Sequence, residues 1–248
     1  MKRGSPDDVK DRIDGIDMPD EKKVQLVVPV KSTTFVDFTV GTQRAYSRYF
    51  QEFMSKRQAD ELFDELYRLK DKLFRQDVVT TPSGKKLAPR LTAAFGDARI
   101  TYKYAGMTQR TNPEYPKLLL ECKCAIEALI GCSLNYAFVN IYEISDSDGK
   151  HVDHYIGWHS DDEGEIVKDD TGATTICSIS LGDERQFQIR KAYKPPQSPT
   201  PIHSTVLHHG SLCTMENQTQ LLCKHQAPKK KNATKVRINV TFRLMHTH

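Results

Sequence analysis

The sequence predicts an α+β protein in which a β-sandwich or barrel is flanked by helices on one side. Two observations predict this class: two amphipathic helical patterns lie in the first half of the chain, and short strand-like segments separated by turns fill the second half. A length of 248 residues with 38% hydrophobic residues suits one large domain, or one domain with an appended N-terminal part.

The N-terminal region divides into two parts by composition. Residues 1–25 are dense in charge with almost no periodic apolar content, so we expect a disordered tail, followed by an N-terminal extension over residues 26–84. The tail lacks the apolar core of a secretory signal, and no apolar run approaches the roughly 20 residues that span a bilayer. We therefore expect a monomeric, soluble, intracellular protein of the nucleus or cytoplasm, with no membrane partner.

Two helices are predicted ahead of the strands. The first covers about residues 55–74, where Ser55 and Gln58 form a capping box before apolar residues at helical spacing. The second starts near Pro113 or Tyr115 and ends at Gly131.

Six strand-like segments follow, separated by turn-rich sequence such as SDSDGK, LGDE and KPPQSPTP. They are YAFVNIYEI, TTICSISL, QFQIRKAY, STVLHH, SLCTMEN and VRINVTFRL.

The six cysteines lie in apolar or helical sequence without a Cys-x-x-Cys pair. We interpret them as reduced, mostly buried thiols. A zinc site built from Cys122, Cys124 and Cys132 is the less favoured alternative, because the spacing fits one face of a helix. The net charge of +4 permits a nucleic-acid partner without requiring one.

The pattern His-x-Asp occurs twice, at residues 151/153 and 159/161. In an extended strand these two side chains point to the same face, and most such pairs are surface polar residues. A second histidine would complete the two-histidine, one-carboxylate set of non-haem Fe(II) oxygenases, which leaves coordination positions open. His225, in LLCKHQAP, is a candidate, although a lone histidine there is also typical of a surface.

The segment VRINVTFRL alternates apolar residues with Arg237, Asn239, Thr241 and Arg243. One interpretation is a half-exposed strand with a solvated basic face. The other is a strand whose inward face binds a small dicarboxylate, because arginine matches a carboxylate with two parallel hydrogen bonds.

Taken together, IGWHSDDE, a later histidine and RINVTFR resemble the AlkB family of Fe(II) and 2-oxoglutarate dependent dioxygenases, which oxidatively demethylate nucleic-acid bases. APRLTAAFGD and ITYKYAG resemble the nucleotide-recognition region of that family, so the resemblance covers about residues 85–245. It implies a double-stranded β-helix (jelly-roll) core within residues 85–248, with flanking N-terminal helices, and it implies Fe(II) and 2-oxoglutarate as cofactor and cosubstrate.

The resemblance also implies roles for individual residues. The iron ligands would be His159, Asp161 and His225, because Ile156-Gly157-Trp158 precedes this His-x-Asp pair as in the family. Residues that would bind 2-oxoglutarate are Asn140, Tyr142, Arg237, Asn239 and Arg243. Residues that would bind the substrate are Arg90, Tyr102, Tyr104 and Glu163, with Tyr104 stacking on the base and Glu163 reading an exocyclic amine.

Positive charge near these segments is available for phosphates, although each cation alone is typical of a solvated surface. The candidates are Lys85, Lys86, Arg90, Arg99, Lys103, Arg110 and the run Lys229-Lys230-Lys231.

The function implied is demethylation of bases such as 1-methyladenine and 3-methylcytosine in DNA or RNA, with release of formaldehyde, succinate and CO2. One alternative keeps the fold and iron but hydroxylates a protein or small molecule. Another is a noncatalytic nucleic-acid-binding protein, which would bind oligonucleotides without turnover of 2-oxoglutarate.

The duplicated His-x-Asp pattern generates a first prediction. We expect His159→Ala to abolish Fe(II) binding and His151→Ala to leave it intact, because only the 159/161 pair has the family context. Anaerobic titration of each variant with Fe(II), followed by metal analysis, measures this. Loss of iron in the His151 variant and retention in the His159 variant would reverse the assignment.

Overall fold

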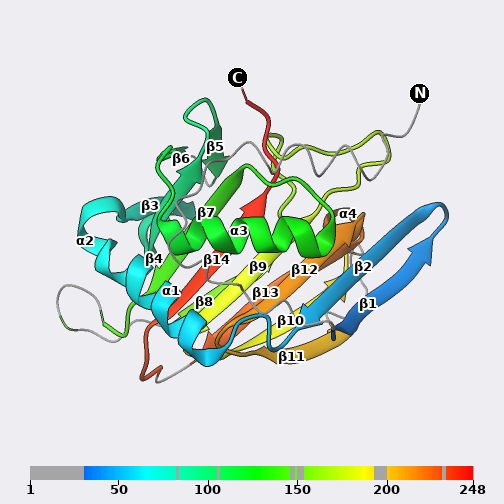
Figure 1. Cartoon of the computed structure of the whole chain (residues 1–248). Helices are drawn as coiled ribbons and strands as arrows, with labels where there is room; N and C mark the ends of the chain where they lie inside the picture. Colours follow the sequence, from blue (N-terminus) through cyan, green and yellow to red (C-terminus); the bar gives the residue numbers. More distant parts are fainter. Residues whose placement is uncertain are drawn as a thin grey trace.

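The computed structural model describes residues 31–81, 84–104, 107–145, 149, 154–192, 200–230 and 233–247. Within these residues, a large antiparallel sheet packs against a smaller one, and the two longer helices cover the outer face of the large sheet (Figure 1). The predicted fold class, a jelly-roll core with flanking helices, is confirmed.

The large sheet has eight strands in the described part of the chain, in the order β1-β2-β12-β9-β14-β7-β4-β3. In chain order they are β1 Thr33–Val40, β2 Gln43–Phe50, β3 Arg75–Thr81, β4 Gly84–Gly96, β7 Tyr136–Tyr142, β9 Ile176–Gly182, β12 Ser211–Asn217 and β14 Arg237–Arg243. All of its pairings are antiparallel, and β14 lies near the middle, between β9 and β7.

The small sheet has the order β11-β10-β13-β8, and a separate hairpin joins β5 to β6. The small-sheet strands are β8 His154–His159, β10 Arg185–Lys191, β11 His203–Leu207 and β13 Cys223–Lys230, and the hairpin strands are β5 Thr101–Tyr104 and β6 Met107–Arg110. The small sheet therefore brings the two ends of the predicted metal set, β8 and β13, side by side.

Side-chain alternation along the central strands creates two separate cores. On β14, Ile238, Val240 and Phe242 pack with the helices. This agrees with the alternation of apolar and polar residues in VRINVTFRL. The alternate positions face the small sheet, where Phe138 and Phe187 belong to the second core. Polar residues of β7 and β14 thus lie in the space between the sheets, out of bulk water.

The helices are α1 Lys56–Arg68, α2 Lys70–Leu73, α3 Lys117–Ile130 and α4 Thr219–Leu222. The capping box of Ser55 and Gln58 is confirmed, and α3 ends at Gly131 in the left-handed conformation, as predicted. The prediction of one helix over residues 55–74 is wrong, because the amide of Leu69 bonds to the carbonyl of Leu66, which tightens the last turn and ends α1.

The cysteines agree with the interpretation of free, mostly buried thiols. All six cysteines are free, and Cys122, Cys177, Cys213 and Cys223 are buried. Cys124, two residues along α3 from Cys122, is exposed. Among the described residues, no helix has the length and apolar character needed to cross a membrane.

The six strands predicted from sequence all form, but eight others lie outside those six segments. They are β1, β2, β3, β4, β5, β6, β8 and β13. The hairpin of β1 and β2 extends the large sheet through β12, and the boundary expected at residues 84 and 85 falls at the start of β4. In β13, Pro228 and several lysines hide the strand pattern, and pairing with β10 and β8 supplies the structure instead.

Gly182, at the end of β9, generates a stability prediction. Its φ is +76°, and a Cβ would clash with the Val236 carbonyl and lie 2.7 Å from the Phe63 ring. We expect Gly182→Ala to lower the free energy of unfolding by about 3 kcal/mol through left-handed strain and overpacking. Gly172, with φ +77° and open space around it, is the matched control and should lose only about 1 kcal/mol on the same change. Denaturant unfolding of both variants measures this, and equal losses would contradict the packing argument.

Candidate metal centre

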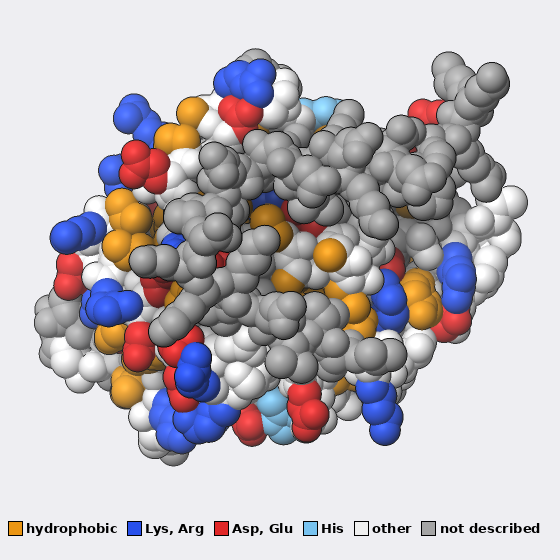
Figure 2. Space-filling model, viewed as in Figure 1, with side chains coloured by type: hydrophobic (Ala, Val, Ile, Leu, Met, Phe, Trp, Pro, Cys, Tyr) orange, Lys and Arg blue, Asp and Glu red, His pale blue; other side chains and the backbone are white. Residues whose placement is uncertain are grey.

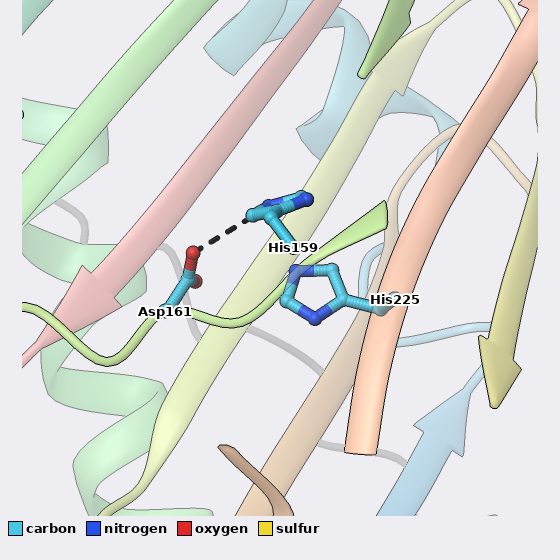
Figure 3. A group of neighbouring side chains, drawn as sticks. All are labelled: His159, Asp161 and His225. Atoms are coloured by element: carbon cyan, nitrogen blue, oxygen red, sulfur yellow. Dashed lines mark ion pairs between the residues drawn. The ribbon is translucent and has the colours of Figure 1, made fainter. Parts of the chain in front are cut away.

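Two histidines and one aspartate converge between the sheets (Figure 3). His159 ends β8 and lies directly opposite His225 of β13, while Asp161 follows two residues after His159. One potential ligand atom from each of the three lies within 4.8 Å of the others. The structure thus brings together all three residues predicted as metal ligands.

The protonation states of the three side chains suit a divalent metal. The Nδ1 of His159 lies 2.7 Å from the Gly157 carbonyl, so its proton is held there and Nε2 keeps its lone pair. Burial lowers the pKa of His225 to about 3, which leaves a neutral imidazole. Burial acts to raise the pKa of Asp161, but Arg243, His225 and His159 outweigh it, and the pKa is lowered. The donor set is the two imidazoles and one carboxylate that Fe(II) takes in oxygenases.

Asp161 is held in place by two further contacts. One of its carboxylate oxygens lies 3.2 Å from a terminal nitrogen of Arg243, and its backbone N–H donates to the Gln220 side chain at 2.9 Å. Gln220, on α4, was not predicted, and nothing in its sequence context marks it. Its position depends on how α4 folds back between β12 and β13.

A cavity of about 70 Å³ adjoins the three ligand candidates. Four of the five residues predicted to bind 2-oxoglutarate line it: Asn140, Tyr142, Arg237 and Asn239. Asn239 donates to Ser178, and Arg237 lies 3.4 Å from the Ser180 hydroxyl. These serines were not predicted, although their alternation in TTICSISL is the period-two signal that places them on one strand face.

The basic face of β14 is buried, so the interpretation of a solvated face is wrong. Arg237 is 5% exposed and Arg243 is 4% exposed. Burial lowers the pKa of Arg237 to about 10, so it is still a cation at neutral pH. Buried N–H groups at Arg237 Nε, Arg243 Nε and Arg243 Nη1 have no hydrogen-bond partner. Each such group costs about 1–3 kcal/mol or more, which an anionic ligand with two carboxylates would offset.

Arg243, the fifth predicted residue, does not line that cavity but joins the metal site to the hairpin of β5 and β6. Its other terminal nitrogen lies 3.9 Å from Glu163, whose Oε1 accepts a hydrogen bond from the Tyr102 hydroxyl at 2.6 Å. The Tyr102 ring also faces the guanidinium of Arg243, 5.1 Å away. A continuous polar chain therefore runs from Asp161 through Arg243 and Glu163 to Tyr102.

Glu163 lies in a loop and not in a strand. Its predicted role in reading the base assumed that the strand of His159 and Asp161 continued through residue 163, but β8 ends at His159. Loop geometry places the carboxylate near the metal site, with Oε2 buried and without a hydrogen-bond partner.

The other predicted substrate residues have distinct surroundings. Tyr102 is 2% exposed and packs on Tyr136 and Phe138, so it offers its hydroxyl rather than an open ring face. Arg90 donates to Asn140 at 2.9 Å, beside the cavity rather than at the surface. The side chain of Tyr104 lies outside the described residues, as do residues 151 and 153 of the other His-x-Asp pair.

Two of the predicted phosphate-binding cations are already paired with carboxylates. Arg99 pairs with Asp97, and Lys230 pairs with Asp183. Arg110 belongs to a larger cavity, considered below.

Comparison with known proteins agrees with this geometry. Residues 47–243 match the family model of the 2OG-Fe(II) oxygenase superfamily. Alpha-ketoglutarate-dependent dioxygenase alkB homolog 3 of Bos taurus is 32% identical over 200 residues, covering 78% of this chain and 64% of that protein. DNA oxidative demethylase ALKBH2 of Homo sapiens is 32% identical over 192 residues, covering 76% of this chain and 69% of that protein. ALKBH2 of Mus musculus is also 32% identical over 192 residues, which cover 75% of that protein.

A solved structure, that of OsALKBH1, shares the fold, with a TM-score of 0.53 and 14% identity over 80% of this chain and 96% of that chain. In the sequence comparisons, this chain spans 64% of the length of the bovine alkB homolog 3 and 52% of the length of the human one. Fe(II) and 2-oxoglutarate, the predicted cofactor and cosubstrate, are those of the matched superfamily, and the donor set and buried cations fit them. The chain belongs to the AlkB family of 2OG-Fe(II) oxygenases.

Proposed function

We propose that this protein removes N-methyl groups oxidatively from 1-methyladenine and 3-methylcytosine in DNA or RNA. The observation that carries the proposal is Oε2 of Glu163, which is buried near the metal ligand candidates and accepts no hydrogen bond, although Arg243 lies 3.9 Å away. Adenine and cytosine each present an exocyclic amino group, a hydrogen-bond donor that a carboxylate oxygen accepts. The names of the relatives, an alkB homolog and DNA oxidative demethylases, support the same class of substrate.

In this proposal His159, Asp161 and His225 hold Fe(II), while Arg237, Asn239, Asn140 and Tyr142 bind 2-oxoglutarate. Arg243 orients Asp161 by pairing with Oδ2, the carboxylate oxygen other than the one that lies 3.6 Å from His159. When bound, iron and 2-oxoglutarate supply the oxidation by O2 that hydroxylates the N-methyl carbon, with formaldehyde, succinate and CO2 as products.

Tyr102 and Arg243 have a positioning role toward the base. The Tyr102 hydroxyl donates to Oε1 of Glu163, and the Arg243 guanidinium lies 3.9 Å from Oε2. Oε2 is then the acceptor that is left for a substrate amino group. Because Oε2 is buried, a base that lacks this donor would leave that oxygen without a hydrogen bond, which disfavours such a base.

The proposed reaction is tested with methylated oligonucleotides. We expect the Fe(II)-loaded protein, with 2-oxoglutarate, ascorbate and O2, to remove methyl groups from DNA or RNA strands carrying 1-methyladenine or 3-methylcytosine. Mass spectrometry measures methyl loss, and His159→Ala, which removes a proposed iron ligand, should abolish it. Succinate formed without methyl loss would instead indicate hydroxylation of another substrate, and the absence of both products would contradict an oxygenase.

The Arg237 guanidinium generates a second prediction. We expect Arg237→Lys to raise the Kd for 2-oxoglutarate at least about tenfold, because an ammonium cannot form two parallel hydrogen bonds with a carboxylate. Anaerobic titration of the Fe(II) protein measures Kd, and thermal unfolding measures stability. Arg48→Lys is the matched control, because Arg48 makes two hydrogen bonds to Glu216 on β12 and does not line the cavity. Equal Kd values for the two variants would contradict the proposed role of Arg237.

A further inference from the structure

A second cavity, larger than the one beside the metal ligand candidates, does not adjoin them. It has a volume of about 290 Å³ and lies between α2, the edge strand β3, its neighbour β4, and β6. Three cations from separate elements line it: Lys72 of α2, Arg75 of β3 and Arg110 of β6. We call these three residues and the space between them the basic pocket.

The charge of the basic pocket is not neutralised from within. Lys72, Arg75 and Arg110 have no ion pair or hydrogen bond from their side chains to any described residue, in contrast to Arg99 and Lys230. One carboxylate, that of Asp77, also lines the pocket, and it accepts a hydrogen bond from the Thr92 hydroxyl at 2.6 Å. Three cations around one acid favour an anionic ligand.

Strand register places Arg75 of the basic pocket on the same face of the large sheet as the metal site, whereas Ala93 and Phe95 of the pocket lining belong to the helix-side core. Arg75 is paired with Thr92, and Thr92 is paired with Asn140, which lines the cavity beside the metal ligand candidates. Paired residues of antiparallel strands point to the same face. Arg75 and Asn140 are therefore two strand spacings apart, about 10 Å, on one face.

The β5–β6 hairpin connects the two sites. Tyr102 reaches Glu163 near the metal site, and its pairing partner Gln109 lines the basic pocket. Arg110 is the next residue along β6. A strand whose base reaches Glu163 would therefore pass this hairpin, and its neighbouring phosphates would come close to the basic pocket.

We propose that the basic pocket binds a phosphodiester group of the nucleic-acid strand that carries the substrate base. The proposal rests on the proposed function, because it assigns the substrate strand as the source of the phosphate. Arginine and lysine contacts to phosphate give affinity without sequence preference and position the strand. The basic pocket would thus hold the backbone while Glu163 reads the base.

The helix-covered face supplies matched control cations. On that face, Lys and Arg side chains are interspersed with Asp and Glu (Figure 2). Arg57 of α1 pairs with Glu61 at 3.2 Å, and Lys117 begins α3. Both helices pack on the side of the large sheet opposite to Asn140. Replacing these two residues removes the same charge as replacing Arg75 and Arg110, but away from the basic pocket.

The test compares the double variant Arg75→Gln/Arg110→Gln with the control double variant Arg57→Gln/Lys117→Gln. Fluorescence anisotropy measures binding of a labelled single-stranded DNA oligonucleotide carrying 1-methyladenine, over a range of salt concentrations. We expect the basic-pocket variant to bind at least about tenfold more weakly. The slope of log K against log salt should also become shallower by about 0.7, as for one lost phosphate contact on a single strand. The control should match the wild type in both quantities.

Three outcomes would overturn the proposal. One is a basic-pocket variant that binds like the wild type, and another is an equal loss in the control, which would show only an effect of net charge. The third uses inorganic phosphate: if it stabilises the wild type but not the basic-pocket variant against thermal unfolding, while oligonucleotide affinity is unchanged, the pocket takes free phosphate and not the strand.

The same proteins separate this proposal from the proposed function. If the wild type removes methyl groups but the basic-pocket variant binds the oligonucleotide as the wild type does, the phosphate site is contradicted and the demethylation reaction is not. Pocket-dependent binding without methyl loss would support the phosphate site and contradict the demethylation reaction.

Discussion

The ion pair between Asp161 and Arg243 is the interaction on which the site depends. Both groups are buried, and an isolated charge in such a position would be strongly unfavourable. Together they keep the carboxylate ionised and directed toward His159 and His225. Because Arg243 also approaches Glu163, one guanidinium on one strand contacts both Asp161, a metal ligand candidate, and the carboxylate that we propose accepts from the substrate base.

That strand, β14, can hold a charged face because of its place in the fold. It pairs with β9 and β7 on its two sides, so all its backbone neighbours are strands, and the helices cover its apolar face. Its polar face is turned toward the small sheet, where Ser178 and Ser180 of β9 provide hydrogen-bond partners. The Nε–H of Arg237, which lines the cavity beside the metal ligand candidates, is left without a partner and is available to a carboxylate.

The proposed contacts with nucleic acid depend on a smaller element. The β5–β6 hairpin is a separate two-stranded sheet. Just after β6, an isolated β-bridge between Asn112 and Phe95 of β4 connects it to the large sheet. It contributes Tyr102 to the metal site and Arg110 to the basic pocket. In our proposals, this small hairpin sets the distance between base recognition and phosphate binding.

Local sequence determined much of this protein. Alternation in VRINVTFRL and YAFVNIYEI predicted the two central strands, and the capping box at Ser55 and the glycine at position 131 predicted a helix start and a helix end. These features depend on neighbours a few residues apart, so they are visible in the chain itself. The spacing of His159 and Asp161 also pointed to the metal site, through its resemblance to a family.

Tertiary structure decided what local patterns left open. Whether the basic face of β14 is solvated or buried depends on the small sheet, which includes β13, a strand that its lysines and Pro228 concealed. The pairing of His225 with His159 and the approach of Gln220 to Asp161 join residues about 60 positions apart. Likewise, the fold brings Asp183 to Lys230, which is paired, but it brings no described carboxylate into an ion pair with Arg110. Long-range contacts of this kind arise from packing and pairing across the whole chain, and no local pattern encodes them.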